Sequence, residues 1–212
     1  NSLQDYRSNW VVNFVLIILI ILGGFGWRVT NDIWINRRSL KLRNLSLHTR
    51  LVIRTSFILV SLGLFGLIFT ESLARGSFFS LINFDDRLLT ALFTSVSART
   101  AGFTNLPISI ESVSDSGLLL IMCLMFIGAS PGGTGGGIKT TTIAALMAAT
   151  RATLRGQNEI IIRNRQISDK VVLKAVGITV GSLLFVLIMA LLLSLSNGLN
   201  SGENFSFLEM LF

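Results

Sequence analysis

The sequence has little of what most catalytic and metal-binding proteins use. Its 212 residues include one cysteine, one histidine and two prolines, and charged residues make up 14% of the chain. A single cysteine excludes a disulfide within the chain and a four-cysteine zinc site. The single histidine, His48, is too few for a histidine metal site or a Ser/His/Asp triad. Because a soluble domain is usually about 25% charged, the composition argues against an ordinary soluble enzyme.

Hydrophobic residues are abundant instead, at 51% of the chain, and they gather into four stretches: 10–27, 51–70, 118–150 and 171–195. A bilayer core about 30 Å thick needs about 20 helical residues, a length that the first, second and fourth stretches provide. As one helix the third would be about 50 Å long, so we expect it to break at residues 129–139. The sequence therefore predicts an all-α, multi-pass membrane protein.

The net charge of +7 comes mainly from two basic segments, 27–50 and 151–174. The positive-inside rule predicts that both segments are cytoplasmic loops and that the acidic connections between the other stretches face outward. The excess of positive charge is then a topology signal. We expect membrane lipid around the protein and no nucleic-acid partner.

A short apolar segment, residues 85–96, follows the second stretch and is too short to cross a bilayer. Asp85 and Asp86 at its start favour a helix N-terminus. Behind it comes a strand of the form Thr-x-Gly-aromatic, made of Thr100, Ala101, Gly102 and Phe103. In a potassium filter such a strand offers main-chain carbonyls that replace the hydration shell of the ion. Taken alone, the tetrapeptide also fits an ordinary Gly-aromatic turn.

A glycine-rich segment interrupts the third stretch. It does not fit a Walker A phosphate loop, because Ile138 separates Gly137 from Lys139 and we expect no strand before it. Irregular backbone at membrane depth is tolerated only where it is buried or lines a wet path. Lys139 either repels permeant cations or forms a pair at the membrane edge, or it only extends to the cytoplasmic interface. The candidate residues of this loop are Gly132, Gly133, Thr134, Gly135, Gly136, Gly137 and Lys139.

Residues 97–103 and the segment MFIGASPGGTGGGIKTTT at 125–142 resemble the Trk/Ktr/HKT superfamily of potassium and sodium transporters, most closely its KtrB-type membrane subunits. The resemblance implies four helix–pore loop–helix repeats around one potassium-channel-like pore. It assigns 1–50 to the closing helix of the second repeat and a cytoplasmic loop, and 51–170 to the third repeat. Residues 171–212 would hold the first helix of the fourth repeat and the start of its pore helix. Since the sequence begins at Asn1, we expect a middle piece of a longer protein.

The same resemblance implies potassium uptake across the plasma membrane, the bacterial inner membrane, without enzymatic chemistry. The transported K⁺ would be bound by the carbonyls of Thr100, Ala101 and Gly102, with the glycine loop as an intramembrane gate beneath them. A cytoplasmic nucleotide-binding regulatory subunit of RCK/KTN type and a homodimer are the implied partners. Two alternatives stay open. One is a sodium-preferring member of the superfamily with Na⁺ as the ion, and the other is a multi-pass membrane protein that conducts nothing.

Overall fold

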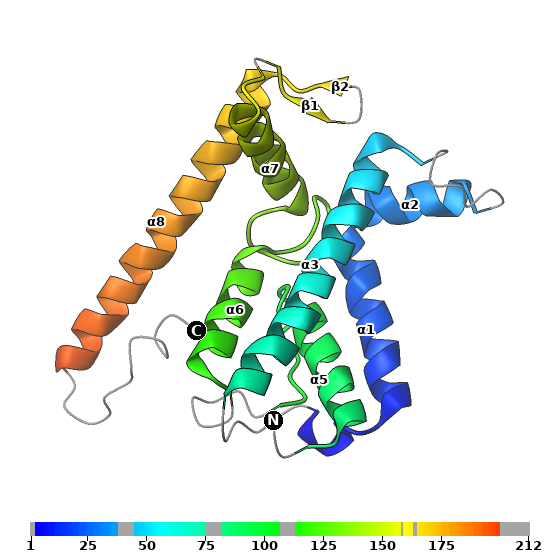
Figure 1. The fold of residues 1–212 in the computed structure, drawn as a ribbon, viewed down its shortest axis with the longest axis vertical. Helices are drawn as coiled ribbons and strands as arrows, with labels where there is room; N and C mark the ends of the chain where they lie inside the picture. Colours follow the sequence, from blue (N-terminus) through cyan, green and yellow to red (C-terminus); the bar gives the residue numbers. More distant parts are fainter. Residues whose placement is uncertain are drawn as a thin grey trace.

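The computed structural model describes residues 3–37, 45–74, 82–106, 113–157, 159–162 and 165–199. Within these ranges the chain is almost entirely helical (Figure 1). The helices are η1 (Gln4–Tyr6), α1 (Trp10–Phe25), α2 (Trp27–Ile35), α3 (Leu47–Leu73), α5 (Phe84–Ser97), α6 (Asp115–Phe126), α7 (Thr140–Leu154) and α8 (Asp169–Leu199). A two-stranded antiparallel hairpin, β1 (Ile161–Ile162) and β2 (Arg165–Gln166), connects α7 to α8.

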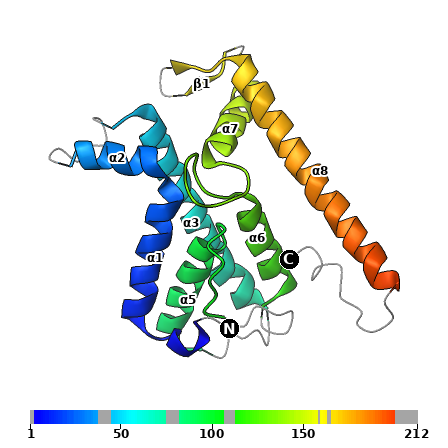
Figure 2. The ribbon, with the colours of Figure 1, turned by 180° about the vertical axis from the view of Figure 1, so that it is seen from behind.

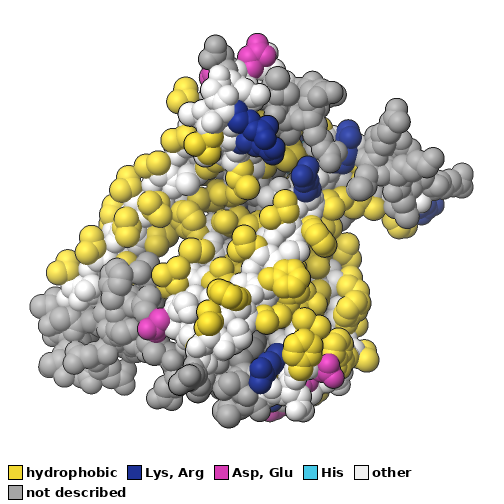
Figure 3. All heavy atoms as spheres, in the orientation of Figure 1, with side chains coloured by type: hydrophobic (Ala, Val, Ile, Leu, Met, Phe, Trp, Pro, Cys, Tyr) yellow, Lys and Arg dark blue, Asp and Glu magenta, His cyan; other side chains and the backbone are white. Residues whose placement is uncertain are grey.

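Two helices of the described chain, α3 and α8, are long and apolar enough to cross a membrane, and α1 with α2 adds a third candidate if that bent pair is one span. These helices cover the first, second and fourth apolar stretches of the sequence. Hydrophobic side chains dominate the middle of the face drawn in Figure 3. The prediction of a helical membrane protein is confirmed to this extent.

The helix α3 is the centre of the packing, because it contacts α2, α5, α6 and α7. The short helix α5 lies between α1 and α3 (Figures 1 and 2). Ser95 on α5 donates a hydrogen bond to the carbonyl of Val60 on α3 at 2.9 Å, and a Cβ at Gly63 would clash with Ser95. A side chain at position 63 would therefore push these two helices apart.

A buried carboxylate joins the end of α3 to the start of α6. Glu71 is 2% exposed and accepts hydrogen bonds from the backbone N–H of Ser114 at 3.1 Å and from its hydroxyl at 2.6 Å. The same hydroxyl accepts from the N–H of Gly117 and so caps α6. Buried polar groups are stable only with such partners, so these hydrogen bonds hold the end of α3 against the start of α6.

The first apolar stretch differs from the expectation. The helix α1 ends at Phe25 because Gly26 has a φ of +77°, and α2 continues at 100° to it. The segment 27–50, expected to be a loop, thus begins with a helix. Asp32 on α2 accepts hydrogen bonds from the Thr49 hydroxyl at 2.5 Å and from the Ser46 N–H at 2.9 Å, which attaches α2 to the start of α3.

Two further expectations concern the C-terminal part. The hairpin β1–β2 lies within 151–174, a segment whose basic composition predicts a loop. The predicted start of a fourth pore helix, within 200–212, lies outside the described residues. The helix α8 contacts α7 (Figures 1 and 2). Most of its apolar side chains are exposed.

Candidate functional site

The predicted short helix at 85–96 is confirmed as α5, with one further residue at each end. Asp85 and Asp86 occupy its first turn, where the helix dipole favours negative charge. Its second half, from Phe93 to Ser97, is buried. At about 21 Å, α5 is too short to cross a bilayer and ends in the interior of the helical packing.

The backbone that follows α5 has unusual dihedral angles. Thr100 has a φ of +66° and Gly102 a φ of +78°. Threonine is β-branched and rarely adopts positive φ, so this conformation costs about 1–3 kcal/mol and persists only where the surroundings impose it.

Side chains fix the end of this segment that follows Gly102. The buried hydroxyl of Ser97 donates to the carbonyl of Phe103. The Thr104 hydroxyl donates to the carbonyl of Leu106 and accepts from its N–H. Asn105 donates to the side chain of Asn13 on α1 at 3.1 Å. The segment is thus attached both to α5 and to α1.

The predicted filter strand is open on one side. Thr100 and Gly102 are exposed, Phe103 is 45% exposed, and a Cβ at Gly102 would meet no atom within 4 Å. The neighbouring residues Asn105 and Leu106 are buried. The strand therefore presents a free backbone face on an otherwise packed support.

The predicted break in the third apolar stretch is confirmed, and the irregular segment 127–139 between α6 and α7 begins two residues earlier than expected. The loop closes on itself through the hydrogen bond from the Ile138 N–H to the Phe126 carbonyl, at 3.0 Å. A Cβ at Gly128 would clash with the carbonyl of Gly136, so the two strands of the loop touch through main chain. The buried hydroxyls of Ser130 and Thr140 lie 2.9 Å apart.

The glycine loop rests on the bend between α1 and α2. The N–H groups of Ser130 and Thr134 donate to the carbonyls of Gly24 and Gly23, at 3.0 and 3.3 Å. These bonds satisfy carbonyls that the end of α1 would otherwise leave free. In return the Trp27 N–H donates to Gly132 at 3.4 Å, and a Cβ at Gly26 would lie 2.6 Å from the carbonyl carbon of Gly132.

The predicted strand and the predicted loop meet at one point. Gly135 lies so close to Thr100 that a Cβ at Gly135 would clash with the Thr100 hydroxyl. The ammonium group of Lys139 donates to the carbonyl of Gly135 at 2.7 Å. Lys139 thus turns back toward the loop. Gly132, Gly133 and Thr134 instead face the bend between α1 and α2.

The glycines of that bend are the site residues that sequence reasoning missed. The pairing could have been suspected from a second cluster of glycines, at positions 23, 24 and 26, in the first apolar stretch. Glycine at both partners is what allows two backbones to come within hydrogen-bonding distance. The signal is weak in the sequence alone, because helix ends and close helix packing use the same residues.

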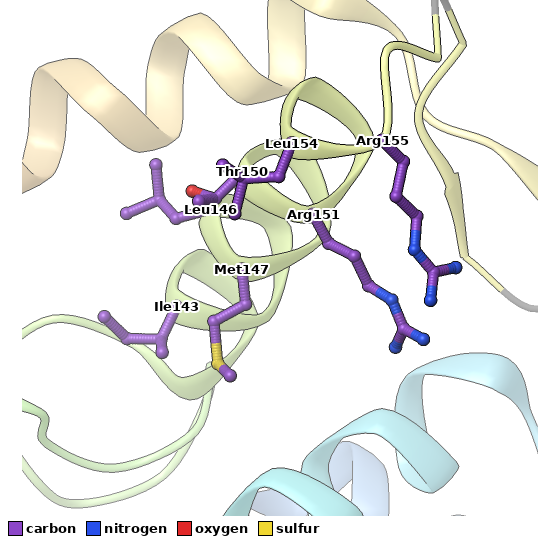
Figure 4. Close-up of a pocket in the computed structure, with 7 residues that line it drawn as sticks. All are labelled: Ile143, Leu146, Met147, Thr150, Arg151, Leu154 and Arg155. Carbon is purple, nitrogen blue, oxygen red and sulfur yellow. The ribbon is translucent and has the colours of Figure 1, made fainter.

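Two hollows in the described part of the chain adjoin α7. One, of about 970 Å³, lies between α6, α7 and α8, and its mostly apolar lining includes Cys123 and Gly137. The other, of about 670 Å³, lies along α7, where Arg151 and Arg155 extend on the side away from α8 (Figure 4). None of the predicted site residues lines the second hollow.

Comparison with known proteins identifies the family of the chain. The family model of TrkH, described as a cation transport protein, matches residues 1–212. The chain is 31% identical over 212 residues to the Ktr system potassium uptake protein B of Bacillus subtilis and 33% identical over 213 residues to its protein D, covering all of the chain and 45% of each relative. It is 30% identical over 200 residues to the potassium/sodium uptake protein NtpJ of Enterococcus hirae, covering 92% of the chain and 42% of that protein. The chain thus spans less than half the length of these relatives.

Proposed function

The chain belongs to the TrkH family of cation transport proteins, whose model matches all of it, and we propose that it forms part of a pore for potassium uptake. The family and the relatives named above are cation transporters rather than enzymes. Because the chain spans less than half of those relatives, the proposal concerns the full-length protein that contains it.

The observation that carries the proposal is the strained, exposed backbone of residues 100–102 at the end of a short buried helix. Positive φ at Thr100 is a conformation that the surroundings must enforce, and such strain concentrates at functional sites. Gly102 adopts its positive φ without strain, because glycine has no Cβ. The Phe103 carbonyl already accepts from Ser97, so the carbonyls of Thr100, Ala101 and Gly102 are the ones we assign to the ion. They would replace its hydration shell as in other carbonyl filters.

The glycine loop, in this proposal, gates the path next to the filter. Its contact at Gly135 and Thr100 puts the loop at one end of the strand, and Lys139 holds Gly135 by a single hydrogen bond. A loop that is attached through main chain and glycine can move without repacking large side chains. Opening would separate Gly135 from Thr100 and clear the end of the strand.

The wider setting is also a proposal. In it the strand and loop belong to the third of four helix–pore loop–helix repeats, the subunits form homodimers, and the protein lies in the plasma membrane. The names of two relatives refer to a Ktr system, which supports a multi-component assembly. A cytoplasmic nucleotide-binding subunit of RCK/KTN type would then bind at the basic end of the molecule and bias the gate.

The test is Gly102→Ser in the full-length protein, measured as initial rates of K⁺ and Na⁺ uptake in cells that lack other potassium uptake. A side chain at Gly102 has open space but a φ of +78°, so it changes the strand through its backbone rather than through a clash. We expect a reduced preference for K⁺. Gly136→Ala is the matched control, because its Cβ would also meet no atom within 4 Å and its φ is not positive. An unchanged ion preference in Gly102→Ser would contradict the filter assignment.

A sodium-preferring transporter is the second candidate, since NtpJ is named as a potassium/sodium uptake protein. Uptake of Na⁺ that K⁺ fails to inhibit would favour it. A full-length protein that reaches the membrane and moves neither ion would instead support a non-conducting membrane protein.

A further inference from the structure

Two buried asparagines connect α1 to the segment that follows the filter strand. Asn13 is 2% exposed and Asn105 is 1% exposed, although asparagine is normally a surface residue. Their side chains are joined by the hydrogen bond from Asn105 Nδ2 to Asn13 Oδ1, at 3.1 Å. The two residues are 92 positions apart in the chain, so the bond links distant elements.

The orientation of Asn13 is determined by its other partners. Its Nδ2 donates to the carbonyls of Tyr6, Arg7 and Asn9, at 2.9, 3.1 and 2.8 Å. Three carbonyl acceptors require the amide nitrogen on that side, so the amide oxygen must face Asn105. Asn13 is therefore a fixed acceptor, held at the start of α1 by the backbone of the preceding turn.

Asn105, in contrast, depends on that acceptor. Its Oδ1 is buried and has no hydrogen-bond partner among the described residues. A buried unsatisfied carbonyl costs about 1–3 kcal/mol, a cost that an apolar side chain at position 105 would avoid. The polar pair thus stabilises the fold less than an apolar pair would. What its geometry does is fix the position of the chain at Asn105, two residues beyond Phe103.

We propose that Asn13 and Asn105 are positioning residues, which fix the far end of the strand 100–103 and thereby the spacing of the carbonyls that discriminate K⁺ from Na⁺. This inference rests on the proposed function of that strand. Ser97 attaches Phe103 to α5, and the asparagine pair attaches the chain at Asn105 to α1, so the strand is held from two helices. Loss of either asparagine releases the second attachment and lets the carbonyls relax around the smaller ion.

The experiment uses the full-length protein with Asn13→Ala, Asn105→Ala and the double variant, and measures the ratio of Na⁺ to K⁺ uptake rates. We expect each single variant to raise this ratio about three- to tenfold, the scale of one lost hydrogen bond. The double variant should go no further than the singles, because both act through one contact. Asn36→Ala is the control: it removes an asparagine side chain whose hydrogen bonds go to Asp32 on α2, and it leaves the ratio unchanged.

An unchanged ratio in both single variants, with normal amounts in the membrane, would overturn the inference, and so would additive effects in the double variant. If the alanine variants fail to accumulate, Asn13→Leu with Asn105→Leu replaces the pair by apolar groups of similar size and should still show the raised ratio. Failure of that variant to accumulate would assign the pair to folding and also overturn the inference. A wild-type protein without K⁺ uptake, or a Gly102→Ser variant with unchanged preference, would instead refute the proposed function.

Discussion

Two irregular segments lie side by side in this molecule, and they are held in different ways. The segment after α5, residues 98–106, is fixed largely by side chains, namely those of Ser97, Thr104 and Asn105. The glycine loop, residues 127–139, is fixed largely by main chain, through N–H groups that bond the carbonyls of the bend between α1 and α2. The two segments touch where Gly135 meets Thr100.

The difference indicates that the segment after α5 stays in place and that the glycine loop can move. A side-chain hydrogen bond to a particular carbonyl fixes that carbonyl, as a filter strand requires. The glycine and backbone surface of the loop allows close approach to the bend between α1 and α2 but has no interlocking side chains, so the loop can separate from the bend as a unit. The loop should therefore tolerate changes that leave its backbone surface free and fail when that surface is filled.

The largest effect is expected from Gly128→Ala. The new Cβ would clash with the carbonyl of Gly136 across the loop, a backbone atom that no rotamer change can move away. Overpacking of this kind costs about 3 kcal/mol or more when backbone must shift. We expect a clear fall in the thermal unfolding midpoint of the purified full-length protein, together with a loss of K⁺ uptake.

Gly136→Ala is the matched control for Gly128→Ala, since it adds the same methyl group to the same loop in open space. Its effect on the free energy of unfolding should stay within about 0.5 kcal/mol. Equal effects of the two variants would mean that the loop is not held by close backbone contact, and the comparison above would fail.

A smaller effect is expected from Ser97→Ala, which tests the side-chain attachment. It removes the donor to the Phe103 carbonyl and should cost about 1 kcal/mol while raising the Na⁺ to K⁺ uptake ratio several-fold. Ser97→Thr keeps the hydroxyl and should restore the ratio. Ser95→Ala, two residues earlier, loses a hydrogen bond to Val60 on α3 and should leave the ratio alone. A change of equal size in Ser95→Ala would show that any loosening of α5 alters selectivity.

The sequence predicted these segments better than it predicted what holds them. The helix over 84–97 and the break before Thr140 follow from apolar run lengths, acidic residues at a helix start and a cluster of glycines. These are local signals, readable along the chain. The positive φ of Thr100 could not be predicted from the local sequence, because threonine disfavours this angle and the surrounding packing imposes it.

Long-range pairings could not be predicted from the sequence for the same reason. Nothing local in Asn13 or Gly24 shows that one bonds Asn105 and the other Ser130. The turn at Gly26 was missed because glycine inside an apolar run fits a continuous helix as well as a bend. Once α1 stops at Phe25, the amphipathic segment after it becomes α2, which the basic composition of 27–50 had made look like a loop.

A still smaller effect is expected from Lys139→Met, which tests how the loop is held next to the filter. The variant removes the hydrogen bond from the ammonium group to the Gly135 carbonyl and should raise K⁺ uptake about two- to fivefold by weakening the closed position. Lys139→Arg keeps a cationic donor and should remain close to wild type. Lower uptake in Lys139→Met, with normal protein in the membrane, would mean that this lysine helps conduction rather than closure.

The smallest effect is expected at Asp32, where α2 is attached to α3. The hydrogen bond from the Thr49 hydroxyl, helped by those from Ser46 and Asn36, holds the pKa of this carboxyl below its usual value. Since the folded pKa lies below the unfolded one of about 3.9, the stabilisation is present above that pH and is lost as the pH falls through the folded pKa. Asp32→Asn should lower the unfolding midpoint at pH 7 by only about 1 °C, because the group is partly solvated. The difference from wild type should shrink below about pH 4.

The K⁺ uptake of Asp32→Asn tests whether the glycine loop moves alone or together with α2. The near end of α2, at Gly26 and Trp27, touches the glycine loop, and its far end is held by Asp32. If the loop moves by itself, Asp32→Asn leaves K⁺ uptake unchanged while Lys139→Met raises it. If Asp32→Asn raises uptake as well, then α2 moves together with the loop. The mobile unit would then extend from the filter contact at Gly135 to the corner between α2 and α3.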